Sequence, residues 1–347
     1  MIDPNISLAQ DLVKLVAEID EFKGRWEALK NLSPDRLNAL RKVATVESVG
    51  SSTRIEGAKL SDIQVETLLS NIKMQKFETR DEQEVAGYAE AMDLIFQAYD
   101  DMPITENHIR QLHQVLLRYS TKDERHRGDY KKLNNHVVAI DAVGNEIGVI
   151  FVTATPFETP RQMEELVHWT CKAVDEKSMH PLLIVAVFTV QFLAIHPFQD
   201  GNGRLSRILT TLMLLRAGYA YVPHASLESV IEENKDIYYK SLRRTQTTLK
   251  GNDPDWTPLI GFFLRCLKKQ KNNLVERLDR VQSQANDAEM PELSLQILEL
   301  FDEHTRLNLS KIVVLTNSNR NTIKVRLREL VSAGCIAKHG KARARGM

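Results

Sequence analysis

The 347-residue sequence lacks the features typical of secreted, disulfide-bonded or membrane proteins. Its three cysteines, Cys171, Cys266 and Cys335, are far apart and odd in number, which excludes a disulfide framework and a CxxC metal site. No basic segment followed by an apolar core opens the chain, and the longest apolar stretch, 181–195, is shorter than the roughly 20 residues of a membrane span. We therefore expect a soluble, cytoplasmic protein in a reducing compartment.

Helix-breaking and aromatic residues are also few. The chain has 15 glycines, 11 prolines and 6% aromatic residues against 43% hydrophobic residues, a composition that favours helices around a substantial core. Apolar residues recur at helical spacing in 8–19, 91–98, 109–116 and 163–170. The exception is 136–152, where two β-branched runs flank a polar turn and predict a single β-hairpin.

The net charge is zero, but the charge is unevenly distributed. Residues 305–347 contain ten basic residues and one acid, Glu329, so they carry +9 and the first 304 residues carry −9. A polar stretch at 271–291, ending beside Pro291, separates the two parts. The pattern predicts an acidic helical body and a basic C-terminal module, an asymmetry that points to nucleic-acid contact.

The segment 195–207, IHPFQDGNGRLSR, concentrates residues suited to phosphate chemistry. Gly201 and Gly203 can adopt positive φ, and the backbone amides of 201–203 can form an anion-binding nest at a helix N-terminus. Arg204 and Arg207 are three residues apart, so they can converge on one polyanion from the following helix. A lone GxG would favour a simple corner between two helices. The polar side chains gathered around these two glycines favour a phosphate-binding site instead.

Two further side chains give the segment a possible reaction. Asp200 suits Mg²⁺, which binds through one or two carboxylates together with substrate phosphates. His196 can take a proton from a nucleophile near neutral pH. A base, a metal ligand and a diphosphate cradle together predict phosphoryl or nucleotidyl transfer.

Residues 196–207 resemble the signature of the Fic (filamentation induced by cAMP) family, HPFx[D/E]GNGRxxR, at every fixed position. The resemblance implies a mainly helical fold that transfers AMP from ATP to a Ser, Thr or Tyr hydroxyl of a protein, releasing pyrophosphate. It implies that His196 is the general base, that Phe198 anchors the loop and that Asp200 binds Mg²⁺. The hairpin 136–152 resembles the family's flap, which aligns the target segment by strand addition.

The nucleotide contacts follow from the same resemblance. The phosphates are assigned to Gly201, Asn202, Gly203, Arg204 and Arg207, with Arg204 on the β-phosphate and Arg207 on the γ-phosphate. Asn234, Tyr238 and Tyr239 lie where the family often contacts the nucleoside. This last match is loose, and helix packing by the two tyrosines is an equal alternative.

An upstream segment, Ser52-x-x-x-Glu56-Gly57, gives only a weak local signal, in which Ser52 caps a helical turn and Gly57 ends it. It also resembles the [S/T]xxxE[G/N] inhibitory motif of autoinhibited Fic proteins. The resemblance implies that Glu56 pairs with Arg207 and takes the place of the γ-phosphate, so that ATP is misaligned for transfer.

The C-terminal residues predict a helix–turn–helix. Apolar spacing at 293–303, a cap at 308–310, a polar turn at 316–320 and a helix at 321–333 precede a short strand beginning at Ile336. This pattern resembles winged-helix modules appended to Fic domains. Contacts to DNA are then expected from one helix and a wing: Arg320, Asn321, Thr322, Lys324, Arg328, Lys338, Lys341, Arg343 and Arg345. Protein contacts or dimer packing, and hence a homodimer, are the alternative.

We therefore expect four segments: an N-terminal helical region at 1–104 with the inhibitory motif 52–57, a Fic core at 105–270, a linker at 271–291 and a winged-helix module at 292–347. The function expected is an autoinhibited protein adenylyltransferase acting on another protein or on itself. One alternative is removal of AMP, or transfer of another nucleotide, on the same fold. The other is a nucleotide-sensing, DNA-binding transcriptional regulator.

Overall fold

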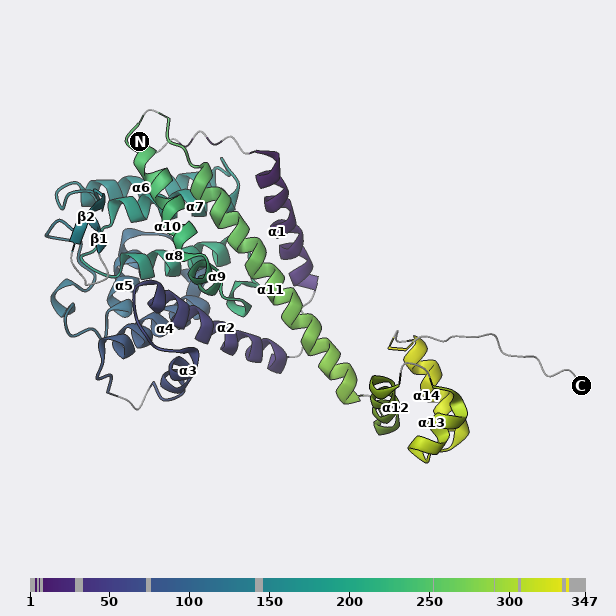
Figure 1. The fold of residues 1–347 in the computed structure, drawn as a ribbon. Coiled ribbons are helices and arrows are strands. Elements are labelled where there is room, and N and C mark those ends of the chain that lie inside the picture. The colour runs from purple at the N-terminus through teal and green to yellow at the C-terminus, as the bar shows by residue number, and fades with distance from the viewer. Residues whose placement is uncertain are drawn as a thin grey trace, which may run out of the picture. The chain divides into compact units, whose positions relative to one another are not determined.

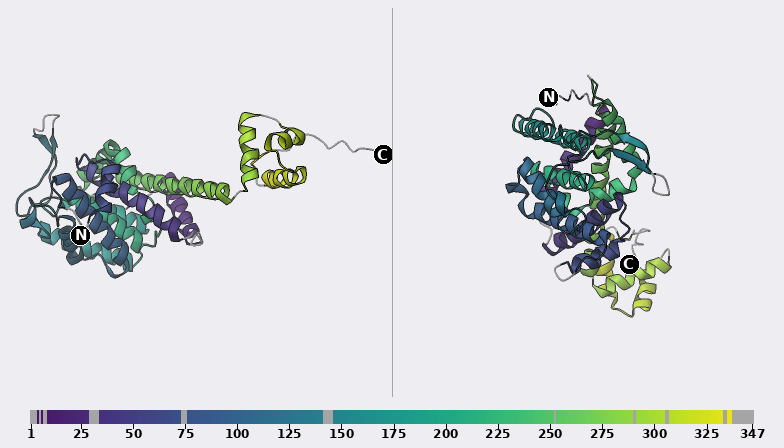
Figure 2. Two further views of the ribbon diagram at one scale, coloured as in Figure 1. Left: turned by 90° about the horizontal axis from the view of Figure 1, so that it is seen from below. Right: turned by 90° about the vertical axis from the view of Figure 1, so that its left-hand side faces the viewer.

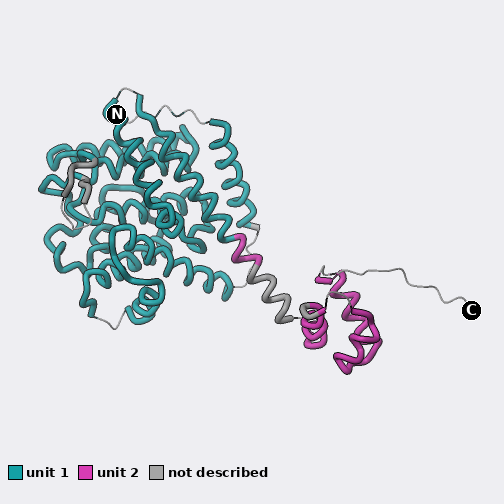
Figure 3. Tube along the Cα trace, viewed as in Figure 1, with its two compact units in different colours: residues 1–274 teal, residues 275–347 magenta. Residues whose placement is uncertain are grey.

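The structure is a computed structural model that describes Pro4, Ile6 and residues 9–28, 34–72, 76–140, 146–251, 253–289, 291–304, 307–332 and 335–336. It divides into two compact units, residues 1–274 and residues 275–347 (Figure 3). None of the helices within the described ranges is long and apolar enough to cross a membrane.

Unit 1 is mainly helical, as the composition predicted (Figure 1). Its α-helices are α1 (Gln10–Ala28), α2 (Pro34–Ile55), α3 (Asp62–Ser70), α4 (Arg80–Ala98), α5 (Glu106–Leu116), α6 (Thr159–Asp175), α7 (Pro181–Ile195), α8 (Asn202–Arg216), α9 (Leu227–Glu233), α10 (Lys235–Thr248) and the first part of α11 (Thr257–Glu289). Short 3₁₀ turns are η2 (Tyr99–Asp101), η3 (Glu124–His126) and η4 (Val222–His224).

Two consecutive helices, α7 and α8, form the centre of unit 1. Helix α7 is apolar on all its faces and is buried along most of its length, as expected of a helix enclosed by others. Helix α8 packs against α7 and also contacts α2, α4 and α5 (Figure 1). Because α8 is also buried, its polar side chains lie inside the unit, where each needs a partner.

The predicted hairpin is present as β1 (Val137–Ile140) and β2 (Glu146–Phe151), which pair antiparallel. The register is irregular at two points, between Val137 and Val138 and between Ala139 and Ile140. Figure 2 shows the strand pair at an edge of unit 1, and β2 runs beside α10. The expected turn at 141–145 lies outside the described residues.

The described residues of unit 2 comprise the end of α11 and three short helices, α12 (Glu292–Glu303), α13 (Leu309–Thr316) and α14 (Arg320–Ser332). These three surround a small core of Ile297, Ile312, Ile323 and Leu330. Asn308 caps α13 by accepting from the Lys311 amide, as the sequence predicted. Helix α11 continues to Glu289, so the expected linker is helical over most of its length. The wing residues, from Lys338 onward, lie outside the described residues.

Candidate functional site

The signature segment forms a tight connection between α7 and α8. His196 ends α7 in the left-handed region, with φ of 53°, and Gly201 precedes α8 with φ of 78°. The second glycine differs from the expectation, because Gly203 lies within the first turn of α8 and is not among the residues with positive φ. Helix α8 begins at Asn202, and the backbone amides of its first turn have no partner within the helix, so they can face a ligand.

Two side chains hold the loop in this shape. The Asn202 amide accepts from the Phe198 N–H at 2.9 Å and donates to the Phe198 carbonyl at 2.7 Å, which closes the loop on itself. Phe198 is fully buried, as expected of an anchor, and stacks on His113 with ring centroids 3.8 Å apart. His113 accepts from the Gly128 amide at 2.9 Å, so its other nitrogen donates to the Asp200 carbonyl at 3.0 Å. Burial lowers the pKa of His113 to about 4, so the ring is neutral at pH 7.

A buried lysine joins the hairpin to the loop. Lys131 Nζ donates to the Ile195 carbonyl at 2.9 Å, to Asn135 at 2.8 Å and to Thr153 at 3.1 Å, and burial lowers its pKa to about 8. Asn135 precedes β1 and Thr153 follows β2, so both ends of the hairpin meet at this lysine. Asn135 also donates to the Phe198 carbonyl at 2.6 Å. The hairpin and the signature loop are thus held as one polar network.

His196 presents a proton acceptor to the site. Its Nδ1 faces the Leu193 carbonyl at 3.3 Å, and because a carbonyl can only accept, Nδ1 carries the proton and Nε2 keeps its lone pair. Burial lowers the pKa of His196 to about 4. The imidazole is therefore neutral at pH 7 and is ready to accept a proton.

Arg207 is paired with the upstream segment 52–57. Its Nε donates to the Ser52 hydroxyl at 2.8 Å, and one terminal nitrogen donates to the Ser52 carbonyl at 2.9 Å and to Glu56 Oε1 at 2.8 Å. The expected capping role of Ser52 is wrong, because Ser52 lies inside α2 and its hydroxyl binds Arg207 instead. Gly57 does end this helical segment, with φ of 106°.

The electrostatics of this pair favour the charged forms of both partners. Burial alone would raise the pKa of Glu56, but the charge and hydrogen bond of Arg207 lower it below its usual value. Burial alone would lower the pKa of Arg207, and the Glu56 carboxylate raises it. Gly203 makes the approach possible, since a Cβ at this position would overlap the Glu56 carboxylate. Glycine at position 203 therefore allows the close approach of Glu56 and is not needed for a positive φ.

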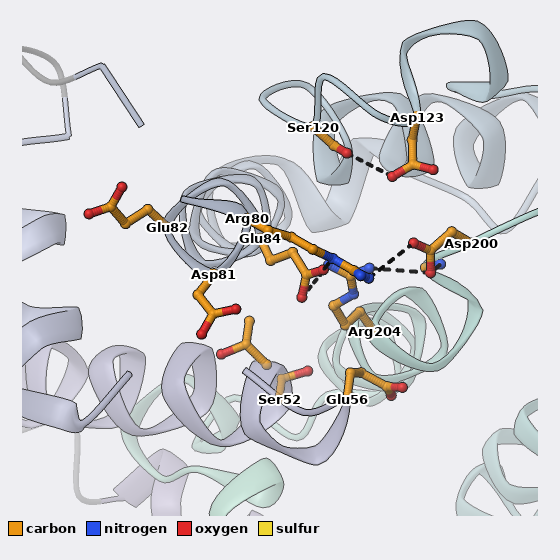
Figure 4. Close-up of polar contacts among 12 residues, drawn as sticks. Ser52, Glu56, Arg80, Asp81, Glu82, Glu84, Ser120, Asp123, Asp200 and Arg204 are labelled. Carbon is orange, nitrogen blue, oxygen red and sulfur yellow. Dashed lines mark hydrogen bonds and ion pairs between the residues drawn. The ribbon is translucent and has the colours of Figure 1, made fainter. Parts of the chain in front are cut away.

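Arg204, one turn before Arg207 on α8, lies between two carboxylates. It forms ion pairs with Glu84 at 3.1 Å and Asp200 at 3.5 Å, and its side chain is 2% exposed (Figure 4). Its Nε is buried and has no hydrogen-bond partner among the described residues. A buried donor left without a partner costs stability, so an acceptor supplied by a ligand suits this position. A phosphate oxygen provides such an acceptor.

Asp200 is the acidic side chain nearest the loop amides. Burial would raise its pKa, but Arg204, the Gly201 amide and Arg80 together lower it, so the carboxylate is ionised at pH 7. The Gly201 N–H donates to Asp200 Oδ1 at 2.6 Å, so this amide is already used within the loop. Within the described ranges no group of three or more acidic, His or Cys side chains could hold a metal ion. Asp200 therefore suits Mg²⁺ only if phosphate oxygens supply the other ligands.

The three residues expected near the nucleoside differ in position. Asn234 lies between α9 and α10 and donates to the Val230 carbonyl at 2.9 Å. Tyr238 is buried against Phe262, and burial raises its pKa to about 12 despite the nearby Arg207. Tyr239 is 41% exposed, with its ring centroid 5.1 Å from that of Tyr238. Packing thus accounts for Tyr238, whereas Tyr239 is open to a ligand.

Sequence reasoning missed several residues of the site: Arg80, Glu84, His113, Lys131 and Asn135. Only the pair on α4 had a readable signal, because Arg80 and Glu84 are four residues apart just after Thr79, which caps α4. The partners of His113 and Lys131 are distant in sequence, so no local pattern identifies them.

A family model described as the Fic/DOC family matches residues 103–214 of the chain. Curated relatives include two proteins named Protein adenylyltransferase Fic. The one from Drosophila grimshawi is 26% identical over 267 residues, which cover 76% of this chain and 50% of the relative. The one from Drosophila mojavensis is 27% identical over 266 residues, covering 75% and 48%. The chain thus spans about half the length of the curated relatives it matches.

Solved structures extend the comparison. A Fic domain containing signaling protein from Bacteroides thetaiotaomicron is 26% identical with a TM-score of 0.61, covering 74% of this chain and 95% of that protein. A Fic family protein from Desulfovibrio desulfuricans has a TM-score of 0.63 and covers 96% of this chain and 92% of that protein. At 24% identity the second match shows the fold alone, and its coverage extends into unit 2.

Proposed function

The chain carries a domain of the Fic/DOC family at residues 103–214, and from this premise we propose that it is an autoinhibited protein adenylyltransferase. The observation that carries the proposal is the ion pair between Glu56 and Arg207, which lies beside a neutral His196. Relatives named protein adenylyltransferase support the reaction class, and the signature residues support its chemistry.

In the proposed reaction, AMP moves from ATP to a Ser, Thr or Tyr hydroxyl of a protein. Nε2 of His196 takes the hydroxyl proton as the oxygen attacks the α-phosphorus. The bond from the α-phosphorus to the bridging oxygen breaks, and pyrophosphate leaves with that oxygen. Two features of the site support this role of His196: the Leu193 carbonyl fixes the tautomer, and the network at Lys131 fixes the loop.

We assign the triphosphate to the first turn of α8. The amides of Asn202 and Gly203 and the unpartnered Nε of Arg204 would bind phosphate oxygens, and Arg207 would hold the γ-phosphate once Glu56 has left. Asp200 would hold Mg²⁺ together with those oxygens. When bound, Mg²⁺ neutralises charge that develops on the leaving pyrophosphate. Tyr239 is the candidate for the nucleoside, because it is the exposed member of the tyrosine pair.

The protein substrate would bind along the hairpin. An antiparallel pair at the edge of a helical unit offers backbone groups to an extended segment, which adds as a further strand. Since both ends of the hairpin are tied to Lys131 and Asn135, a segment held there has a fixed position relative to His196.

Glu56 would restrain this reaction by occupying Arg207. A carboxylate already paired with the guanidinium competes with the γ-phosphate for the same donors, so ATP cannot adopt the position needed for transfer. Removing one partner of a half-buried ion pair frees the other for a new ligand.

The test is the Glu56→Gly variant, incubated with Mg²⁺, a protein lysate and ATP carrying a tagged α-phosphate. We expect labelling to rise at least about tenfold, because a hydrogen bond to a charged group contributes roughly 1.5–3 kcal/mol. The double variant Glu56→Gly/His196→Ala is the control, and it should bind nucleotide but transfer no label. Mass spectrometry of the labelled protein identifies the added group and its acceptor.

Other outcomes separate the alternatives. Equal labelling by the parent protein and Glu56→Gly would remove the inhibitory role of Glu56. An added mass other than AMP would indicate transfer of a different group, and release of AMP from a modified protein would indicate the reverse reaction. Full transfer by the double variant would exclude His196 as the base.

A second candidate function, DNA binding by unit 2, is favoured by one observation. Arg320, Thr322, Lys324 and Arg328 are all exposed on α14, which follows α13 across a short turn. We propose that α14 enters the major groove with these residues, supported by the basic charge of 305–347.

A further inference from the structure

Four charged side chains, one of them Asp200, form a closed ring in which positive and negative groups alternate (Figure 4). Arg80 pairs with Glu84 Oε1 at 2.7 Å and with Asp200 Oδ2 at 3.6 Å. Arg204 pairs with Glu84 Oε2 at 3.1 Å and with Asp200 Oδ1 at 3.5 Å. Each carboxylate thus gives one oxygen to each guanidinium.

The members of the ring differ in how firmly they are held. The side chains of Arg204 and Glu84 are 2% and 8% exposed, and that of Asp200 is 32% exposed. The Arg80 side chain is 62% exposed, so it is the member that can leave most easily. Its backbone is fixed, because Thr79 and Glu82 cap the first turn of α4 with a reciprocal pair of hydrogen bonds. Movement of Arg80 therefore requires only its side chain.

We propose that Arg80 takes the place of the divalent cation at Asp200 and thereby sets the Mg²⁺ concentration at which nucleotide binds. This inference rests on the proposed function, in which Asp200 binds Mg²⁺ together with the phosphates of ATP. The Arg80 guanidinium lies 3.6 Å from Asp200 Oδ2, so Arg80 and a cation would compete for this oxygen. Arg80 is then a positioning residue, acting on the metal through the carboxylate it occupies.

Glu84 makes the exchange reversible. When Arg80 leaves Asp200, it keeps its shorter contact to Glu84, four residues along the same helix. The guanidinium therefore stays beside the site and returns when the metal leaves. Glu84 also keeps its contact to Arg204, so the phosphate-binding side chain is oriented in both states.

The test measures metal-dependent binding without turnover. A fluorescent ATP analogue with a methylene bridge between the α- and β-phosphorus is held at fixed concentration with full-length Glu56→Gly protein. Mg²⁺ is titrated, and the fluorescence anisotropy of the analogue rises as the analogue binds. The Mg²⁺ concentration that gives half of this rise is the half-rise concentration. Chelation of Mg²⁺ by the free analogue is the same for every variant, so ratios between variants report on the protein.

We expect Arg80→Gln to lower the half-rise concentration about threefold, the effect of losing one exposed ion pair that competes with the metal. Arg80→Lys keeps the charge and is expected to stay within about twofold of the parent. Arg161→Gln is the matched control, because Arg161 is 63% exposed and pairs with Glu165, four residues along α6. Affinity for the analogue in EDTA should be the same in the parent and in Arg80→Gln.

Three results would overturn the proposal. An unchanged half-rise concentration in Arg80→Gln, with Asp200→Asn losing the metal dependence, would reject Arg80 and leave the proposed function intact. Weaker binding of the analogue by Arg80→Gln in EDTA would mean that Arg80 contacts phosphate instead. Absence of any metal dependence in the parent protein would reject both the role of Arg80 and that of Asp200.

Discussion

At the scale of single residues, the neutral His113 has a defined thermodynamic consequence. Its pKa is lowered to about 4 by burial, whereas in the unfolded chain it returns to an ordinary value near 6.5. Between these two values the unfolded state binds more protons than the folded state. Stability is therefore at its full level above pH 6.5 and is lost as the pH falls toward 4.

We expect the free energy of unfolding to fall by about 3 kcal/mol between pH 6.5 and pH 4 because of this histidine. Each unit by which its pKa is lowered contributes roughly 1.4 kcal/mol. Denaturant unfolding at pH 7.5, 5.5 and 4.5 measures the loss. His113→Gln should remove the share of the pH dependence that belongs to His113, while His196, whose pKa burial also lowers to about 4, keeps its own share. His168→Gln changes an exposed histidine on α6 and is the control. An NMR titration that gave the folded His113 ring a pKa near 6.5 would refute the explanation without any variant.

The residues of 196–207 could be predicted from the sequence because their order along the chain is itself the signal. Apart from Glu56, which the family resemblance implied as the partner of Arg207, their partners could not. Ser52 has the composition of a helix cap, yet α2 continues past it and its hydroxyl meets Arg207, 155 residues away. Gly203 has the pattern of a turn glycine, but it is helical and leaves room for Glu56. The role of each residue is decided by its contact with a segment that is distant in the sequence. The local sequence pattern carries no information about that contact.

At the scale of elements, the C-terminal end of α2 is held by a clamp at Arg54, two residues before Glu56. The Arg54 guanidinium binds Glu232 on α9 through two contacts of 2.7 and 3.0 Å and Asp62 on α3 at 2.9 Å. Since α9 leads into α10, this clamp ties the segment 52–57 to the helix that carries Tyr238 and Tyr239.

Loosening this clamp should release Glu56 in part. We expect Arg54→Gln to raise labelling above the parent protein but to leave it several-fold below Glu56→Gly, because the Glu56–Arg207 pair itself is kept. Arg41→Gln is the matched control, since Arg41 lies on the same helix, pairs with Asp93 at 3.9 Å and lies over the Phe96 ring at 4.9 Å, both on α4 and away from Glu56. Labelling by Arg54→Gln that equals the parent would show that the Arg207 contacts alone position α2.

Among the elements, the helical body and the hairpin could be predicted from the periodicity of apolar residues, since both leave a local trace. The attachment of the hairpin could not. Lys131 is among the most buried charged residues of unit 1, and nothing in its neighbourhood of the sequence marks it as the point where both ends of the hairpin meet the signature loop. The polar composition of 268–288 predicts a helix that continues into a linker, and α11 does extend through it to Glu289.

At the scale of the whole molecule, the charge difference between the body and residues 305–347 leads to a test on DNA. Double-stranded DNA should retain the protein at low salt, and Lys324→Gln/Arg328→Gln should reduce the slope of log affinity against log salt by about 2, one for each lost phosphate contact. Arg326→Gln is the control, because Arg326 pairs with Glu329 on the same helix. A parent protein that ignores DNA at low salt would reject the groove contacts of α14.

Glu56 and Arg207 belong to one polypeptide, and their contact lies entirely within unit 1. The carboxylate is therefore present at a fixed local concentration, whatever the amount of protein in the cell. Dilution of the protein therefore leaves the contact between Glu56 and Arg207 unchanged. An anion that binds Arg207 must compete with a carboxylate that stays attached to the same chain. A change in expression level alone would then leave the rate of AMP transfer per molecule constant.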